Sequence, residues 1–305
     1  VSATELARQI PEKHWNFARN LLTQHGVPTD GFGPEDRGRL GDQITVLPDV
    51  VERSLDVAFR HPIKLIANAL GVPPRAMIDR ARQHGVAVAA LVGAREHALK
   101  QAAAGVDILV AQGTEAGGHC GEVSTLVLVP EILDALGPDR SAYVLAAGGI
   151  MTGRQMAAVM ALGADGAWTG SVWLPTTESE CGQALREKLL AASSRDTVRS
   201  RSRTGKYCRQ LKSAWTEAWD SPGSPRPLPM PFQHLISLPA FERIEKAAES
   251  GHPGAQALNS YFVGQGIGLV HEIRSARQVV QDFLTGFTEA YADLQAFIGD
   301  DKENA

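Results

Sequence analysis

The residues best suited to chemistry lie in a glycine-rich segment, GTEAGGHCG, at residues 113–121. It directly follows the apolar stretch DILVAQ, which reads as a buried strand. Its glycines allow backbone conformations that are closed to other residues and let backbone amides approach a ligand. His119 is a candidate general acid or base, because the ordinary pKa of imidazole lies near neutrality. From spacing alone, a loop histidine without a role is an equally good interpretation.

Two more glycine-containing segments end consecutive predicted strands: AAGGI at 146–150 and TGS at 169–171. In α/β barrels the loops after the last two strands often bind phosphate through backbone amides. The candidate contacts are three glycine amides and one hydroxyl group: Gly148, Gly149, Gly170 and Ser171. Ordinary strand-to-helix turns are the alternative, but their pairing on consecutive strands favours a phosphate site.

Two other side chains near His119 invite a chemical interpretation. Gln112 ends the strand before the histidine segment, and its amide can both donate and accept, as the edge of a flavin or nicotinamide ring requires. Cys120 is adjacent to His119, but neighbouring residues of an extended loop point apart, so nucleophilic catalysis by a thiolate–imidazole pair is not expected.

The elements that must position these residues alternate along the chain. Continuous apolar strands, typical of a parallel sheet covered on both faces, are predicted at 84–93, 104–113, 143–149 and 162–171. Amphipathic helices are predicted between them at 94–104, 129–137 and 153–163. Upstream, the sequence predicts two earlier strands at 14–22 and 61–71, with a helix at 47–59 between them. These six strands are two short of a closed (β/α)₈ barrel.

After about residue 180 the alternation is expected to stop. Residues 195–212 are polar and basic and are predicted to form a solvated or lid loop, and the Pro-rich segment 221–231 to be an extended connector. The remaining residues are helical in pattern. The prediction is therefore a barrel over residues 1–194 and a mostly helical lobe over residues 195–305.

Composition excludes several classes of protein. Thirty Lys and Arg residues against 34 Asp and Glu give a net charge of -4, which argues against a dedicated nucleic-acid binder. Three scattered cysteines without a CxxC pair argue against a disulfide framework or a cysteine-rich zinc site. We therefore expect no metal, and we expect a reducing, cytoplasmic setting. No apolar run reaches the ~18 residues of a membrane span. The sequence contains neither GxxxxGK[ST] nor a GxGxxG that follows a strand, so neither a nucleotide triphosphatase nor a Rossmann dehydrogenase is indicated.

Together, GTEAGGHCG and AAGGIMTGRQMAAVMALGADGAWTGSVWLPTTES (146–179) resemble the nitronate monooxygenase family of FMN-dependent barrel enzymes. The resemblance extends over residues 14–290 and includes TGKYCRQL (204–211) and YFVGQGIGL (261–269). Flavin-dependent enoyl-acyl-carrier-protein reductases carry a very similar EAGGH loop. The resemblance is thus more specific for the superfamily than for one activity.

The resemblance implies FMN-dependent oxidation of an alkyl nitronate by O₂ to a carbonyl compound and nitrite. His119 matches the active-site histidine of the family. The positions that match residues around the FMN ring are Asn20, in the family's early GVNL strand, and Gln112, Gly117 and Gly118. Gly148, Gly149, Gly170 and Ser171 match the phosphate-binding positions. The expected partners are a small nitronate or related anion and O₂, without nucleic acid or membrane, and a homodimer is one option for assembly.

The chain also departs from the family. The first strand, of the PIIQAPM type, and the second strand are absent, so we expect a TIM-type barrel that lacks its first two strands in a chain incompletely represented at its N-terminus. Trp168-Thr169-Gly170-Ser171 stands where Gln-Met-Gly-Thr is usual. Three alternatives stay open: an NAD(P)H-dependent reductase of an enoyl thioester or quinone, a non-catalytic flavin- or phosphate-binding protein, and an inactive fragment.

Overall fold

The computed structural model describes residues 2–36 and 48–299. Contacts among these residues define two compact units. Unit 1 comprises Val1–His61, Gly117–His119 and Glu180–Val263, and unit 2 comprises Pro62–Ala116, Cys120–Ser179 and Gly264–Ala305. The chain therefore crosses between the units several times, and this division differs from the predicted boundary at residue 194. Each unit is described by itself.

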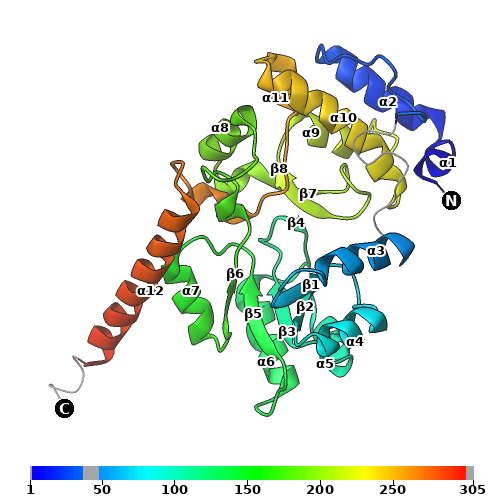
Figure 1. Ribbon diagram of the computed structural model, residues 1–305. Coiled ribbons are helices and arrows are strands. Elements are labelled where there is room, and N and C mark those ends of the chain that lie inside the picture. The colour runs from blue at the N-terminus through cyan, green and yellow to red at the C-terminus, as the bar shows by residue number, and fades with distance from the viewer. Residues whose placement is uncertain (1, 37–47, 300–305) are drawn as a thin grey trace. The chain divides into compact units, whose positions relative to one another are not determined.

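Unit 2 is built on a five-stranded parallel sheet with the order β1-β2-β3-β5-β6 (Figure 1). Its strands are β1 (Leu65–Asn68), β2 (Ala87–Val92), β3 (Ile108–Gln112), β5 (Tyr143–Ala147) and β6 (Gly166–Trp168). The connecting helices are α4 (Arg75–Gln83), α5 (Arg95–Ala103), α6 (Thr125–Leu136) and α7 (Gly153–Ala161). Strands adjacent in this order are also consecutive parallel strands along the chain, as in a (β/α) barrel. The α/β fold class is confirmed.

The local sequence explains these units. Gly85, Gly105 and Gly163 have φ values of 64°, 87° and 101°, the left-handed conformation that ends a helix before the next strand. At the start of two strands a carboxylate fixes the neighbouring strand. Asp107 accepts the amide of Val88 at 2.8 Å, and Asp165 accepts that of Val144 at 2.7 Å.

One of the six predicted strands is wrong. Residues 14–22 lie within helix α2 (Glu12–Gln24) of unit 1. The apolar side chains that look like part of a strand recur three and four positions apart, which is the helical period. They form the buried face of the helix: Trp15, Ala18, Leu21 and Leu22. The predicted strand at 61–71 and the helix at 47–59 are confirmed as β1 and α3 (Pro48–Ala58).

Unit 1 is mostly helical around a core rich in tryptophan. Its other helices are α1 (Ala3–Ala7), α8 (Gln183–Ala191), α9 (Ala214–Asp220), α10 (Phe232–Glu249) and α11 (Pro253–Leu258). Trp15, Trp215 and Trp219 are at most 2% exposed and belong to one apolar cluster that also contains Ile236 and Phe241.

A three-stranded antiparallel sheet also belongs to unit 1. It has the order β4-β8-β7, with β4 (Gly118–His119), β7 (Thr197–Ser200) and β8 (Cys208–Leu211). The prediction of a solvated loop over 195–212 is therefore wrong. Ser200, Cys208 and Gln210 are at most 1% exposed, because the hairpin packs its small and polar side chains inward and satisfies them with hydrogen bonds.

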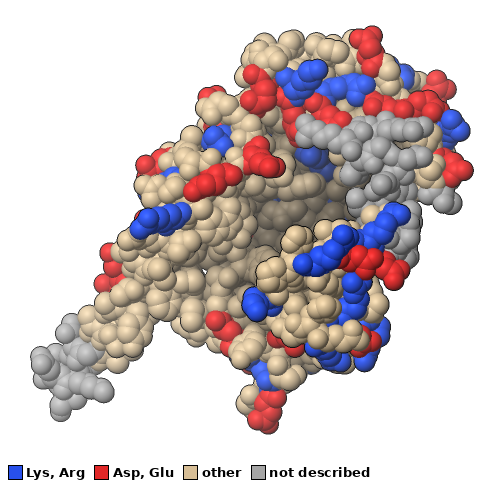
Figure 2. All heavy atoms as spheres, viewed as in Figure 1, with Lys and Arg blue, Asp and Glu red and all other residues tan. Residues whose placement is uncertain are grey.

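The chain returns to unit 2 through the short helix η4 (Gln265–Leu269) and ends in helix α12 (Ala276–Gly299), which packs against α7. The approach is close, because a Cβ atom on Gly153 would lie 2.0 Å from the carbonyl oxygen of Phe283. Within residues 2–36 and 48–299, none of the helices has the length and apolar character needed to cross a bilayer. Figure 2 shows acidic and basic side chains interspersed over the viewed face.

Candidate active site

Four of the predicted site residues lie together in unit 2, where two neighbouring strands end. Strand β5 is followed by Gly148 and Gly149, and β6 by Thr169, Gly170 and Ser171. Their positions are fixed by the register of the sheet, in which Ala147 of β5 pairs with Trp168 of β6. Parallel strands end at the same edge of a sheet, and this edge carries ligand sites in α/β proteins.

Glycine is required at both positions after β5. Gly148 has φ 108° and Gly149 has φ 73°, values that side chains other than glycine rarely adopt. A Cβ atom on Gly148 would lie 2.8 Å from the hydroxyl oxygen of Thr125 and 3.2 Å from the amide nitrogen of Ala116. On Gly149 it would lie 3.3 Å from Cβ of Glu115.

The amides at this edge are available to a ligand. Among the described residues, Gly149 and Gly170 donate their amides to no other backbone carbonyl, and no atom lies within 4 Å of a Cβ position on Gly170. The Ser171 hydroxyl accepts the amide of Gly264 at 2.8 Å, which leaves its own proton to donate. Two amides and a hydroxyl group of this kind fit an anion such as a phosphate. We call these residues, Gly148, Gly149, Gly170 and Ser171, the amide cradle.

The side chains of Glu115 and Thr125 form a carboxylate–hydroxyl pair next to Gly148 and Gly149 of the cradle. The sequence did not predict this pair. Glu115 accepts the Thr125 amide at 3.0 Å and the Thr125 hydroxyl at 2.9 Å, at the N-terminus of α6. The backbone carbonyl of Glu115 accepts the amide of Gln265 at 2.8 Å. The two side chains are ten residues apart, outside any capping spacing, so only the folded chain reveals the pair.

Gln112 ends β3 at the same edge of the sheet and pairs with Ala147 in the register of β5. Its side chain is half-buried, and no hydrogen bond joins it to the described residues. Its amide group can therefore both donate and accept a hydrogen bond.

His119 belongs to unit 1, where β4 pairs with β8 through Gly118–Arg209 and His119–Cys208. Its Nε2 atom lies 2.8 Å from the hydroxyl oxygen of Thr204. Burial, and to a lesser degree the charge of Lys206, lower the pKa of His119 below its ordinary value. The imidazole is therefore mainly neutral at pH 7, which is the state of a general base.

The segment Gly117–His119 passes briefly into unit 1, while its chain neighbours Ala116 and Cys120 belong to unit 2. The segment is thus preceded and followed in the sequence by residues of unit 2. Gly118 has φ 74° and nothing lies within 4 Å of a Cβ position there, so its glycine serves conformation rather than close packing. The thiol of Cys120 lies 3.6 Å from the carbonyl oxygen of Thr114.

Asn20 does not lie on a strand. It is an exposed residue of α2, so the premise that placed it at the end of a barrel strand is wrong.

The structure adds His234, and through it Arg203, to the surroundings of His119. Only Arg203 comes from the segment predicted to be a solvated or lid loop. His234 of α10 has a pKa lowered by burial, then by the charge of Arg203 and finally by His119 itself. The Arg203 guanidinium lies 3.5 Å from the ring centre of Phe241 and donates to the carbonyl of Ser260 at 2.8 Å. Basic runs usually lie on the surface, so the sequence carried no signal for this inward placement.

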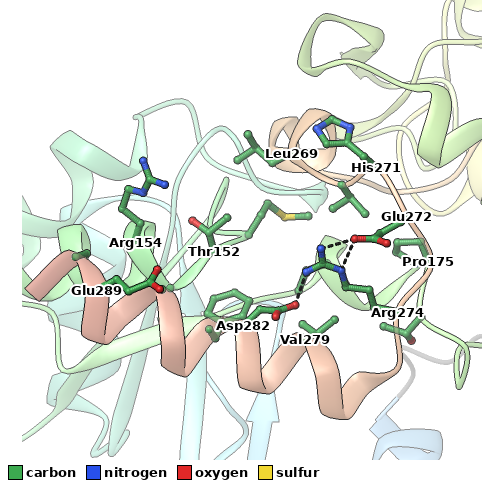
Figure 3. Close-up of a pocket in the computed structure, with 18 of the residues that line it drawn as sticks. Thr152, Arg154, Pro175, Leu269, His271, Glu272, Arg274, Val279, Asp282 and Glu289 are labelled. Atoms are coloured by element: carbon green, nitrogen blue, oxygen red, sulfur yellow. Dashed lines mark hydrogen bonds and ion pairs between the residues drawn. The ribbon is translucent and has the colours of Figure 1, made fainter.

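A separate pocket of about 370 Å³ lies in unit 2 between the start of α7, the segment after η4, and α12 (Figure 3). Arg274 donates to Glu272 at 2.9 Å and also forms an ion pair with Asp282. These ion pairs hold the segment before α12 against the helix. Within the part of the chain that the structure describes, no cluster of three or more His, Cys, Asp or Glu side chains could hold a metal ion.

Solved structures define the class of protein. Nitroalkane oxidase from Streptomyces ansochromogenes is similar with a TM-score of 0.74 and 28% identity, over 92% of this chain and 78% of that chain. FabK from Thermotoga maritima is similar with a TM-score of 0.67 and 29% identity, over 84% of this chain and 77% of that chain. These likenesses define an α/β oxidoreductase of the TIM-barrel class, as the sequence predicts.

Sequence comparison gives the family. The nitronate monooxygenase profile matches residues 10–286, so the chain belongs to the nitronate monooxygenase family. A relative from Mycobacterium tuberculosis (strain ATCC 25618 / H37Rv), named "Putative monooxygenase Rv1533", is 50% identical over 301 residues, which cover 98% of this chain and 78% of the relative. The family resemblance inferred from the two glycine-rich motifs is confirmed.

Proposed function

We propose that this protein binds FMN and oxidises a small alkyl nitronate with O₂, yielding a carbonyl compound and nitrite. The amide cradle is the observation that carries the proposal, because its amides and hydroxyl group match the needs of a phosphate at the place where FMN barrels hold one. Membership of the nitronate monooxygenase family and the likeness to a nitroalkane oxidase support the choice of substrate.

In this proposal the amides of Gly149 and Gly170 and the Ser171 hydroxyl hold the phosphate. Gly148 lets the chain turn where a larger residue would strike Thr125. Gln112 offers an amide to the polar edge of the flavin ring, and Gly117 and Gly118 line the same ligand. Bound FMN supplies the redox chemistry, accepting electrons from an organic substrate and passing them to O₂.

The chain's own catalytic contribution is the imidazole of His119. As a neutral base it takes the proton from the carbon next to the nitro group of a nitroalkane, which leaves a nitronate anion and an imidazolium. When the substrate arrives as the nitronate, the imidazolium form instead donates a hydrogen bond to it. The lowered pKa of His119 favours the neutral base at pH 7.

The direct test is anaerobic mixing of the FMN-loaded protein with propionate 3-nitronate, followed at the visible absorbance of the flavin. We expect rapid bleaching of the flavin. When O₂ is admitted, the absorbance should return and nitrite should be released. His119→Ala should keep its FMN and lose roughly 10²–10⁴-fold in rate with a nitroalkane substrate.

Other outcomes would decide against the proposal. Rapid bleaching by NADH or NADPH without bleaching by the nitronate would establish the reductase alternative. Full turnover by His119→Ala would remove the proposed base. A purified chain that neither retains nor rebinds FMN would contradict the cofactor assignment.

A further inference from the structure

We infer that Thr204 is a positioning residue that fixes the tautomer of His119, with Nε2 carrying the proton and Nδ1 as the basic nitrogen. This inference deepens the proposed function and depends on it only for the use to which the base is put. The tautomer itself follows from three contacts of a single buried hydroxyl group.

The Thr204 hydroxyl oxygen has three polar neighbours. The Lys206 amide donates to it over 3.3 Å, the Lys206 carbonyl oxygen lies 3.2 Å away, and Nε2 of His119 lies 2.8 Å away. A threonine hydroxyl has one proton to donate and can accept two hydrogen bonds. Because the carbonyl can only accept, the hydroxyl proton must point to it for all three contacts to be hydrogen bonds. The imidazole then has to donate from Nε2.

The opposite tautomer forfeits a contact. If Nε2 carried no proton, the hydroxyl would donate to it and the contact with the Lys206 carbonyl would be lost. Thr204 is only 4% exposed, so its hydroxyl has little access to water as a replacement. The tautomer with Nε2–H is therefore the one that satisfies this group.

Nδ1 is left in the state that a base requires. No hydrogen bond joins it to any described residue, and it is not among the buried polar atoms of the described chain that lack a partner. The lone pair on Nδ1 is therefore not engaged by a described residue and is not fully buried, whereas Nε2 is engaged within the protein. The charged and titratable groups near this side of unit 1 are Lys206, Arg203 and His234.

The loop that carries Thr204 is held so that its hydroxyl cannot easily turn away. Gly205 has φ 85°, and a Cβ atom there would lie 2.1 Å from the Leu228 carbonyl oxygen. Arg201 and Gly205 exchange two hydrogen bonds, from the Gly205 amide at 2.9 Å and from the Arg201 side chain at 2.8 Å. A site held this firmly fixes the orientation of its partner imidazole.

The test is ¹⁵N NMR of histidine-labelled protein at pH 8, with His119→Gln used to assign the His119 signals among the nine histidines. We expect an unprotonated Nδ1 and a protonated Nε2 in the wild type. Thr204→Val, which keeps the shape but removes the hydroxyl, should shift the ring toward a mixture of tautomers. Thr204→Ser should keep the wild-type signals. A wild-type spectrum with a protonated Nδ1 would overturn the inference.

Turnover of the FMN-loaded variants gives a second readout. Thr204→Val should lower kcat by up to roughly 100-fold with little change in KM, and Thr204→Ser should recover most of the loss. Thermal unfolding should first show that the wild type and Thr204→Val are both folded. Equal kcat in the two proteins would then contradict a positioning role. If the wild type fails to oxidise nitronates but its NMR spectrum shows the Nε2–H tautomer, the proposed function fails and the tautomer assignment stands.

Discussion

The two units each hold candidate site residues, and these are positioned in different ways. In unit 2 the amide cradle is built from backbone amides and one side-chain hydroxyl, that of Ser171, and its glycines matter because they carry no side chain. In unit 1 the surroundings of His119 are built from side chains, each held by a neighbour, as the three contacts of the Thr204 hydroxyl show. The first region should be sensitive to added atoms, and the second to lost hydrogen bonds and altered charges.

The difference follows from what each region handles. A phosphate is an anion with several acceptor oxygens, so donors at the right place suffice. A proton transfer also needs a defined protonation state, and only side chains can titrate.

The largest effect is expected from Gly148→Ala. The added Cβ would lie 2.8 Å from the Thr125 hydroxyl in a backbone with φ 108°, so we expect loss of FMN retention and a lower free energy of unfolding. Gly31→Ala is the matched control, because Gly31 has φ 69° but no atom within 4 Å of the new Cβ. The control should show only the conformational cost of roughly 1–2 kcal/mol. Flavin content measures FMN retention and urea unfolding measures the free energy of unfolding, for both variants. Full FMN retention by Gly148→Ala would contradict a cradle that is sensitive to added atoms.

Ser171→Ala should weaken FMN binding about 5–10-fold, as expected for one hydrogen bond of about 1–1.5 kcal/mol. The variant loses the donor to the phosphate and the acceptor of the Gly264 amide. Fluorescence titration of the flavin-free protein gives the dissociation constant. Ser171→Thr, which keeps the hydroxyl, should bind FMN like the wild type; unchanged binding by the alanine variant would exclude Ser171 from the cradle.

Lys206→Met should move the acidic limb of the kcat/KM profile to higher pH. The Lys206 charge lowers the pKa of His119, so removing it raises that pKa, and a higher pH is then needed to free the base. The shift should be small, because the Lys206 side chain is exposed and its charge is screened. Lys212→Met is the control, since Lys212 does not contribute to the pKa of His119. A shift to lower pH would contradict His119 as the titrating base.

The smallest effect is expected from Arg274→Ala in the pocket beside α12. Its ion pairs with Glu272 and Asp282 are between side chains that are 43–63% exposed, so their loss should cost no more than about 1 kcal/mol. FMN retention and the pH profile should not change. A loss of FMN in this variant would show that the cradle depends on charged side chains after all.

The sequence predicted the regions in which structure follows from local pattern. The apolar strands with their helix-ending glycines and the paired glycines after β5 and β6 are local features, and the structure contains them where they were expected. Residues 14–22 were misassigned because a short apolar run looks alike in a strand and a buried helix face. The hairpin β7–β8 was missed because its inward polar side chains are satisfied by partners that are distant in sequence.

The same reason explains which site residues could be foreseen. Gly148 and His119 are candidates because of their residue type and their place after predicted strands, although spacing alone leaves a loop histidine without a role equally open. Thr204 lies 85 residues from the imidazole that it contacts, and Glu115 caps a helix ten residues further on. Such pairs become visible only when the chain is folded, because no periodicity connects them.

Strand β4 has only two residues, and its two register pairs, Gly118–Arg209 and His119–Cys208, have a consequence for how this protein can change in evolution. Successive strand residues face opposite sides, so adding or removing one residue before β4 would turn the imidazole to the other face. A change in the length of the segment between β3 and β4 therefore alters the side that His119 faces, whereas a substitution there does not shift the register. We therefore expect natural variants of this segment to differ in composition and to share the number of residues that separates Gln112 from His119.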